Sequence, residues 1–139
     1  MDDLVALMDQ LRRHEGLRLH PYRCTAGKLT IGVGRNLDDN GITENEADFL
    51  LSNDLNRVAT ELRQNSPAFD KLDPVRKAVL IDMCFNLGIS RLRMFKKMFA
   101  AIDEQDWALA AEEMVDSRWC SQVGQRCEIL RMMMETGRR

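Results

Sequence analysis

The hydrophobic positions follow a helical spacing at both ends of the chain and change to a β-rich pattern between them. Leucine and methionine recur every three or four positions in the first 15 residues, which predicts a helix that ends at Gly16. Residues 17–34 contain short β-rich pieces such as LTIGVG, separated by a turn with the sequence TAGK at 25–28. We expect a small hairpin or a three-stranded sheet in this region.

The remaining pattern is helical. After a turn at DDNG, residues 38–41, Thr43 and Glu46 form a capping box that starts a long amphipathic helix, which Ser66-Pro67 interrupts. Asp73 and Pro74 provide an N-cap and a first helical residue, and the following helix, apolar on nearly every side, ends at Gly88. Three more helical segments follow: 90–102, 103–116, and a last one with Cys127, Leu130 and Met134 on one face, ending at Gly137.

These elements predict an α+β fold that is mostly α. We expect one domain over 1–139, with a small antiparallel β-lobe at about 16–42 and a connecting helix at about 43–63. A helical lobe at about 66–139 would also include the helix at 1–15. Composition agrees with a single domain, since the 139 residues are 45% hydrophobic and 30% charged.

Composition also limits the partners. The apolar runs are far shorter than the roughly 20 residues of a membrane span, so no stable membrane association is expected. The start MDDLVALMDQ lacks a basic region before an apolar run, so no secretory signal is expected. The net charge is −2, and residues 37–73 carry nine acidic and three basic side chains. This distribution disfavours nucleic acid as the partner.

The four cysteines show no metal-binding spacing, because there is no CxxC pair and the only histidines are His14 and His20. We expect no metal and no cofactor. Without a signal peptide the thiols would be made in a reducing compartment. Cys84 and Cys127 lie in apolar helical patterns and are expected to be core residues.

Glu15 is the first candidate for chemistry. It stands at the predicted C-terminal end of a helix, where the helix dipole disfavours a carboxylate, and partial burial beside the sheet would act in the same direction. Both effects would raise its pKa, which suits a general acid. The alternative is an ordinary surface acid at a helix end, and position alone favours that alternative.

Cys24 and Thr30 are the next candidates. If the chain turns at TAGK, the strand beginning at Leu29 runs back beside Cys24, so both side chains could face one cleft. Taken singly, the threonine is typical of a strand and the cysteine of inert packing. Gly32 and Gly34 do not form a phosphate loop, and we interpret them as positions where the backbone approaches another group closely.

Residues 14–35, HEGLRLHPYRCTAGKLTIGVGR, closely resemble the active-site segment of the phage-type lysozymes, glycoside hydrolase family twenty-four. The resemblance extends to ITENEADFLLSNDL at 42–55, similar to the inter-lobe helix of that family. It also covers LDPVRKAVLIDMCFNLG at 72–88, similar to the central buried helix, and SRW at 117–119. One strong motif and three supporting ones occur in the same order.

This resemblance implies a two-lobed lysozyme-like fold and a muramidase that hydrolyses the β-1,4 bond between N-acetylmuramic acid and N-acetylglucosamine in bacterial peptidoglycan. The family pattern is Glu, eight residues, Asp or Cys, five residues and Thr, which Glu15, Cys24 and Thr30 satisfy. Glu15 is then the general acid, and Cys24 and Thr30 position or activate the water. Phe85 matches an aromatic that lines the cleft, and Arg126 matches an arginine paired with the catalytic glutamate.

Two features depart from the commoner pattern. Cys24 stands where aspartate is more common, and a thiol with an ordinary pKa near 8.5 is mostly neutral at pH 7. The segment between Gly34 and Ile42 is short, so the β-lobe lacks strand material found in longer members.

Other functions remain open. The missing aspartate fits a catalytically weak glycan-binding homologue, although Glu15 and Thr30 are intact. The Met-rich RMMME at 131–135 and the terminal Arg138-Arg139 could belong to a protein-binding or DNA-binding module. A methionine cluster in an amphipathic helix is more often core filler, and terminal arginines are usually solvated.

The expected partner is the peptidoglycan glycan strand, bound by a monomer. With no signal and no anchor, the protein is expected to stay in the cytoplasm of the host bacterium. The resemblance implies that a membrane pore, a holin in family terms, then releases it to the cell wall.

Overall fold

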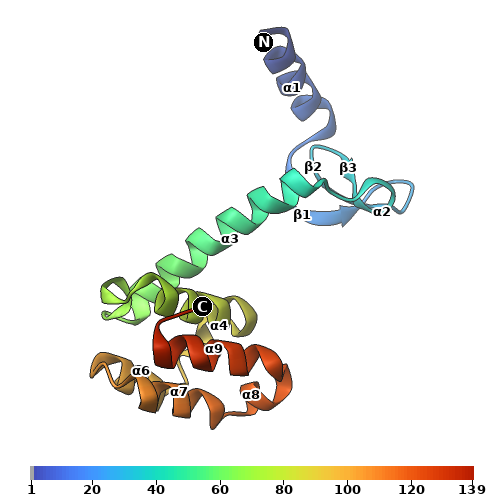
Figure 1. Cartoon of the computed structure of the whole chain (residues 1–139). Coiled ribbons are helices and arrows are strands. Elements are labelled where there is room, and N and C mark those ends of the chain that lie inside the picture. Colours follow the sequence, from blue (N-terminus) through green and yellow to red (C-terminus); the bar gives the residue numbers. More distant parts are fainter. Residues whose placement is uncertain (1) are drawn as a thin grey trace. The chain divides into compact units, whose positions relative to one another are not determined.

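The computed structural model describes residues 2–139, which fall into two compact units, 1–49 and 50–139. Figure 1 shows the first unit in blue to teal and the second in green to red. The chain is mostly helical with one small antiparallel sheet, so the predicted α+β, mostly α class is confirmed. Each unit is described by itself below.

The first unit holds a three-stranded antiparallel sheet in the order β1-β2-β3. In this register the central strand β2 places Thr30 between Tyr22 of β1 and Asn36 of β3. The three-stranded alternative is therefore the correct one. The elements of this unit are α1 (Asp2–Glu15), β1 (Arg18–Arg23), β2 (Leu29–Gly32), β3 (Arg35–Asn36) and α2 (Leu37–Asn40).

The prediction of a plain turn at 38–41 was wrong, because α2 is a four-residue helix ended by Gly41. Its N-cap is Asn36, whose side-chain oxygen accepts a hydrogen bond of 3.0 Å from the backbone N–H of Asp39. Asx side chains bond readily to nearby backbone in this way, and the same bond would also stabilise a turn.

The start of α3 (Glu44–Asn65) is tied to the sheet through Glu46. The capping box is confirmed: Thr43 N–H donates to Glu46 Oε1 at 2.8 Å, and Glu46 N–H donates to Thr43 Oγ1 at 3.1 Å. Arg35 on β3 also donates two hydrogen bonds to this carboxylate, from Nη1 to Oε1 at 2.9 Å and from Nη2 to Oε2 at 2.7 Å. Hydrogen bonds from Arg35 and from the Thr43 backbone lower the pKa of Glu46 to about 2.

We expect Glu46 to contribute to acid stability. Its pKa is depressed in the folded protein, so its contribution is present above the ordinary value of 4.5 and disappears as the pH falls toward about 2. Glu46→Gln should therefore be less stable than wild type at pH 7, with a shallower loss of stability below pH 4.5. Urea unfolding at several pH values measures this. Glu44→Gln is the matched control, and equal acid slopes in wild type and Glu46→Gln would contradict the prediction.

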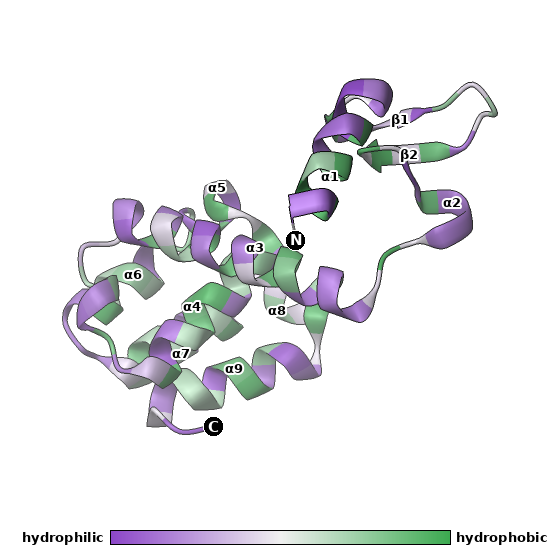
Figure 2. Cartoon of the chain, turned by 90° about the horizontal axis from the view of Figure 1, so that it is seen from above, coloured by the Kyte–Doolittle hydropathy of each residue, from purple (hydrophilic) through white to green (hydrophobic). Residues whose placement is uncertain are grey.

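The second unit is a helical bundle around one hydrophobic core. Helix α9 lies beside both α4 and α7, and all three helices carry hydrophobic residues, green in Figure 2. Fully buried core side chains include Leu62, Val79, Leu80, Met83, Leu92, Met98, Met114 and Met134. Besides α3, the elements are η1 (Phe69–Lys71), α4 (Pro74–Leu87), α5 (Ile89–Leu92), α6 (Lys96–Asp103), α7 (Trp107–Val115), α8 (Arg118–Val123) and α9 (Gln125–Thr136).

The predicted start of α4 is confirmed, because the Asp73 side chain accepts a hydrogen bond from the backbone N–H of Arg76 at 3.1 Å. Arg76 also fixes α4 against the end of α9: its Nε donates to the Met134 carbonyl at 2.6 Å. Its guanidinium also stacks over the Trp107 ring, with the central guanidinium carbon 4.0 Å from the ring centroid.

The helix predicted over 90–102 is two helices, α5 and α6, with a break at residues 93–95. Leu92 and Met98 are both fully buried. In one continuous helix these residues, six positions apart, would point about 120° apart around the axis. The break allows both side chains to reach the same core.

The end of the chain differs from the prediction in one helix and one bond. Helix α8 was not predicted; it is N-capped by Ser117 and separated from α9 by Gly124. Cys127 is buried, as expected, but it is bonded to Cys120 in a disulfide and is not a free thiol. Cys84 is a buried free thiol. Met133 and Met134 are buried in α9, as expected for core filler, whereas Met132 of the same cluster is exposed.

Within the described residues 2–139, no helix combines the length and the apolar character that crossing a bilayer requires.

Candidate active site

Glu15 is the last residue of α1, and the next residue closes the helix because Gly16 N–H donates to the Arg12 carbonyl at 2.8 Å. The carboxylate lies against Gly34, in the turn between β2 and β3. A Cβ placed on Gly34 would be 3.2 Å from Glu15 Oε2. Glu15 as a whole is exposed, so the expected partial burial beside the sheet is not found.

Gly34 confirms the interpretation of this glycine as a point of close backbone approach. Its φ is +71°, in the region that disfavours other residues, and the absent side chain leaves the space that the Glu15 carboxylate uses. Gly32 has nearly the same φ, +70°, but no atom lies within 4 Å of the corresponding Cβ position. Only Gly34 is therefore coupled to the candidate acid.

Cys24 follows β1 and opens the hairpin turn of residues 24–28. Its N–H donates to the Lys28 carbonyl at 3.0 Å, and its carbonyl accepts from Gly27 N–H at 2.8 Å. The side chain is half-buried and is a free thiol. Hydrogen bonds from the backbone at Lys28 and at Ala26 favour the thiolate and lower the pKa of Cys24, with a further contribution from the Thr30 side chain.

Thr30 is almost fully buried, with 3% of its surface exposed, although it carries a hydroxyl. That hydroxyl donates to the Lys28 carbonyl at 2.8 Å and also lies within hydrogen-bonding reach of the Cys24 thiol. The structure thus brings Cys24 and Thr30 together, as the hairpin predicted. A thiol inclined to ionise beside a fixed hydroxyl can orient a water molecule and accept a proton from it.

The three candidates belong to the same compact unit. Glu15 lies at the turn that follows β2, and the Cys24–Thr30 pair lies near the start of that strand. The arrangement supplies a carboxyl group, a thiol and a hydroxyl on one small sheet. Among residues 2–139, no three His, Cys, Asp or Glu side chains gather in a way that could hold a metal ion.

Phe85 and Arg126 lie in the second unit. Phe85 is on α4 and is 47% exposed. Arg126, on α9, donates from Nε to Oδ1 of Asp82 on α4 at 2.8 Å. One turn further along α4, Asn86 accepts a 2.8 Å hydrogen bond from Nε1 of Trp119. The pairing of Arg126 with Glu15 stays a prediction.

Sequence reasoning missed Asp82 and Asn86. They flank Phe85 on α4 and hold Arg126 and Trp119. The available signal was their spacing: they are polar residues four positions apart in an otherwise apolar helix, so they share one face.

Comparisons with known proteins identify the family. The model of the phage lysozyme family matches residues 12–135. The protein named probable T4-type lysozyme 1 of Dictyostelium discoideum is 31% identical over 162 alignment positions, which cover 95% of each chain. This alignment is longer than the 139-residue chain, so the relative has residues without counterparts here.

Two phage proteins are also similar. An endolysin of Acyrthosiphon pisum secondary endosymbiont phage 1 is 32% identical, over 58% of this chain and 56% of the endolysin. The pre-baseplate central spike protein Gp5 of Enterobacteria phage T4 is 29% identical, and the match covers 96% of this chain but only 28% of that protein.

The small antiparallel sheet and the helical bundle, together with the family match over residues 12–135, define a glycoside hydrolase of the lysozyme type. The chain belongs to the phage lysozyme family, as its resemblance predicted, and it is a peptidoglycan hydrolase.

We expect Gly34→Ala to lower activity by displacing Glu15. A positive φ costs a residue with a side chain about 1–2 kcal/mol, and here the added methyl would also press on the carboxylate. Misplacing a reacting group by about 1 Å can cost about 10²-fold in rate. Lysis assays together with thermal unfolding measure the two effects. Gly32→Ala is the matched control, with the same strain and no neighbour; equal activity of the two variants would contradict the assigned contact.

Proposed function

We propose that the protein is a muramidase that cleaves the β-1,4 bond between N-acetylmuramic acid and N-acetylglucosamine. The observation that carries the proposal is the placement of a lowered-pKa thiol against a buried threonine hydroxyl, in the same unit as a carboxyl at a helix end. The order and spacing of Glu15, Cys24 and Thr30 also match the family pattern, in which the first residue is the general acid and the other two position or activate the water.

In the proposed reaction, Glu15 gives a proton to the glycosidic oxygen as the bond from the anomeric carbon to that oxygen breaks. A water molecule held by Thr30 and Cys24 attacks the anomeric carbon, and the Cys24 thiolate accepts the proton that the water loses. The products are two shorter glycan strands, and one of them has a new reducing end. This mechanism requires a protonated Glu15 and an ionised Cys24 in the same molecule.

Phe85 and Arg126 are proposed to support substrate binding. An exposed aromatic ring gives the apolar face of a sugar a flat surface on which to pack. Arg126 is held by Asp82 in a half-exposed ion pair, so its remaining N–H groups can donate to sugar hydroxyls or to acetamido oxygens.

A catalytically weak glycan-binding protein is the second candidate, because a thiol at residue 24 is a rarer base than a carboxylate. Clearing of a cell-wall suspension, measured beside a pull-down on the same walls, separates the two. A muramidase clears the suspension at catalytic enzyme concentrations. Binding without clearing would favour the second candidate, and neither binding nor clearing would contradict both.

The cellular setting is also part of the proposal. The protein acts as a monomer, stays in the cytoplasm of the host bacterium and reaches the wall through a membrane pore of the holin type. Expression with and without such a pore, followed by measurement of culture turbidity, tests the release step.

A further inference from the structure

The disulfide between Cys120 and Cys127 joins α8 to α9 across Gly124. The two Cα atoms are 5.1 Å apart. Each cysteine directly follows a residue that bonds to α4: Trp119 precedes Cys120, and Arg126 precedes Cys127. The bond therefore connects the two backbone positions next to these contacts.

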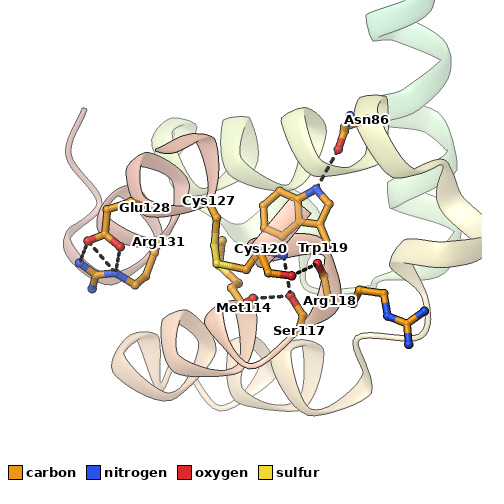
Figure 3. The surroundings of a disulfide bond; sticks show 10 residues. Asn86, Met114, Ser117, Arg118, Trp119, Cys120, Cys127, Glu128 and Arg131 are labelled. Carbon is orange, nitrogen blue, oxygen red and sulfur yellow. Dashed lines mark hydrogen bonds and ion pairs between the residues drawn. A yellow bond between two sulfur atoms is a disulfide. The ribbon is translucent and has the colours of Figure 1, made fainter. Parts of the chain in front are cut away.

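Both contacts end on the last part of α4, within one helical turn of Phe85. The Trp119 indole donates to Asn86, as Figure 3 shows, and the Arg126 guanidinium donates to Asp82. Asp82 and Asn86 are one helical turn apart and share a face of α4, and Phe85 lies in the same turn. Trp119 is 4% exposed and also meets the ring of Phe95 edge to face, with centroids 6.4 Å apart.

Trp119 is also held by its burial in the core, whereas helix α8 and the Arg126 contact have little support of their own. Helix α8 has six residues, too few for a helix to be stable by its own hydrogen bonds. Its N-cap is the Ser117 side chain, and it ends at Gly124, where φ is +58°. The Arg126–Asp82 pair is about 40% exposed on both sides, and such pairs contribute little alone. The covalent bond adds a constraint on the α8–α9 corner to the burial of Trp119 and Cys127.

We propose that the Cys120–Cys127 disulfide is a positioning element for glycan binding: it holds Trp119 and Arg126 against Asn86 and Asp82, in the turn of α4 that carries Phe85, so that affinity for peptidoglycan depends on the redox state of this pair. This inference rests on the proposed function. Reduction converts the disulfide to two thiols with two electrons and two protons. A dithiol such as dithiothreitol supplies both and becomes a cyclic disulfide.

The first test compares glycan affinity in the two redox states. The full-length Glu15→Gln variant, which should bind without cleaving, is titrated with purified soluble peptidoglycan strands before and after treatment with dithiothreitol. We expect reduction to weaken binding about tenfold, the order expected for the loss of one hydrogen bond from a charged group. Cys24 and Cys84 are thiols in both states, so the reductant changes only this pair.

Cys120→Ser in the same background is the matched variant. It removes the bond at the half-buried cysteine and leaves Cys127 in the core. It should bind like the reduced protein and should not respond to dithiothreitol. Thermal unfolding is the control, and the reduced protein and the Cys120→Ser variant should both remain folded at the assay temperature.

The second test reads the position of Trp119 directly. The bond to Asn86 should protect the indole N–H from exchange with solvent, and reduction should increase the exchange rate; Trp107→Phe identifies which indole signal belongs to Trp119. Weaker binding with faster exchange supports the inference. Equal affinity in the two redox states, or an unchanged exchange rate, would overturn it. Failure of the proposed function is distinct: oxidised wild type would then not clear cell walls.

Discussion

Glu15→Gln is expected to abolish visible lysis while leaving the fold intact. The amide has the same shape and still fits beside Gly34, but it has no acidic proton to give to the departing sugar oxygen. Loss of a general acid typically costs roughly 10²–10⁴-fold in rate. Clearing of cell walls measures the activity, and thermal unfolding measures the fold.

Glu44→Gln provides the matched control, because it makes the same chemical change at an exposed residue of the same unit. Binding to cell walls should survive in both variants. A Glu15→Gln protein that lyses walls at the wild-type rate would remove Glu15 from the mechanism.

Substitutions of Cys24 are expected to have the second largest effect, because the thiol is proposed to accept a proton from the attacking water. Cys24→Ala should lower the rate by roughly 10²–10⁴-fold, the usual cost of losing an acid–base group. Cys24→Asp should stay active and should extend activity to lower pH, because a carboxylate ionises at lower pH than a thiol. Rates measured across the pH range check both expectations.

Cys24→Ser tests the charge at nearly constant size, since a hydroxyl does not ionise near neutral pH. If serine supports the wild-type rate, Cys24 does not act as a thiolate and only holds the water. If alanine also supports the wild-type rate, Cys24 is packing, and Glu15 and Thr30 carry the chemistry.

Local patterns were enough to predict much of the fold. The capping box at Thr43 and Glu46 and the N-cap at Asp73 depend on contacts within four residues, so the sequence contains all of the partners. The hairpin behaves similarly, because a short turn forces its strands to pair and brings Cys24 to Thr30.

Features that depend on distant partners could not be predicted in this way. Helical periodicity does not show that Leu92 and Met98 share a core, so the break between α5 and α6 was missed. Cys120 and Cys127 are seven residues apart, and no spacing rule distinguishes a bonded pair at this separation from two free thiols.

In the candidate site, too, local features were predicted and contacts between distant residues were not. The sequence predicted that another group approaches the backbone at Gly34. It did not predict that this group is Glu15, because the contact joins a helix end to a turn 19 residues away. Phe85 and Arg126 were found only through the family resemblance. The bond from Arg126 to Asp82 spans 44 positions and became visible only in the folded chain.

The most direct test of the muramidase assignment is the identity of the new reducing ends released from purified peptidoglycan. Digested material is reduced with borohydride and hydrolysed, and the sugar alcohols are separated and identified. Cleavage after N-acetylmuramic acid predicts muramitol, formed by wild type and absent with Glu15→Gln. Glucosaminitol in its place, or lysis with no new reducing ends, would contradict the account.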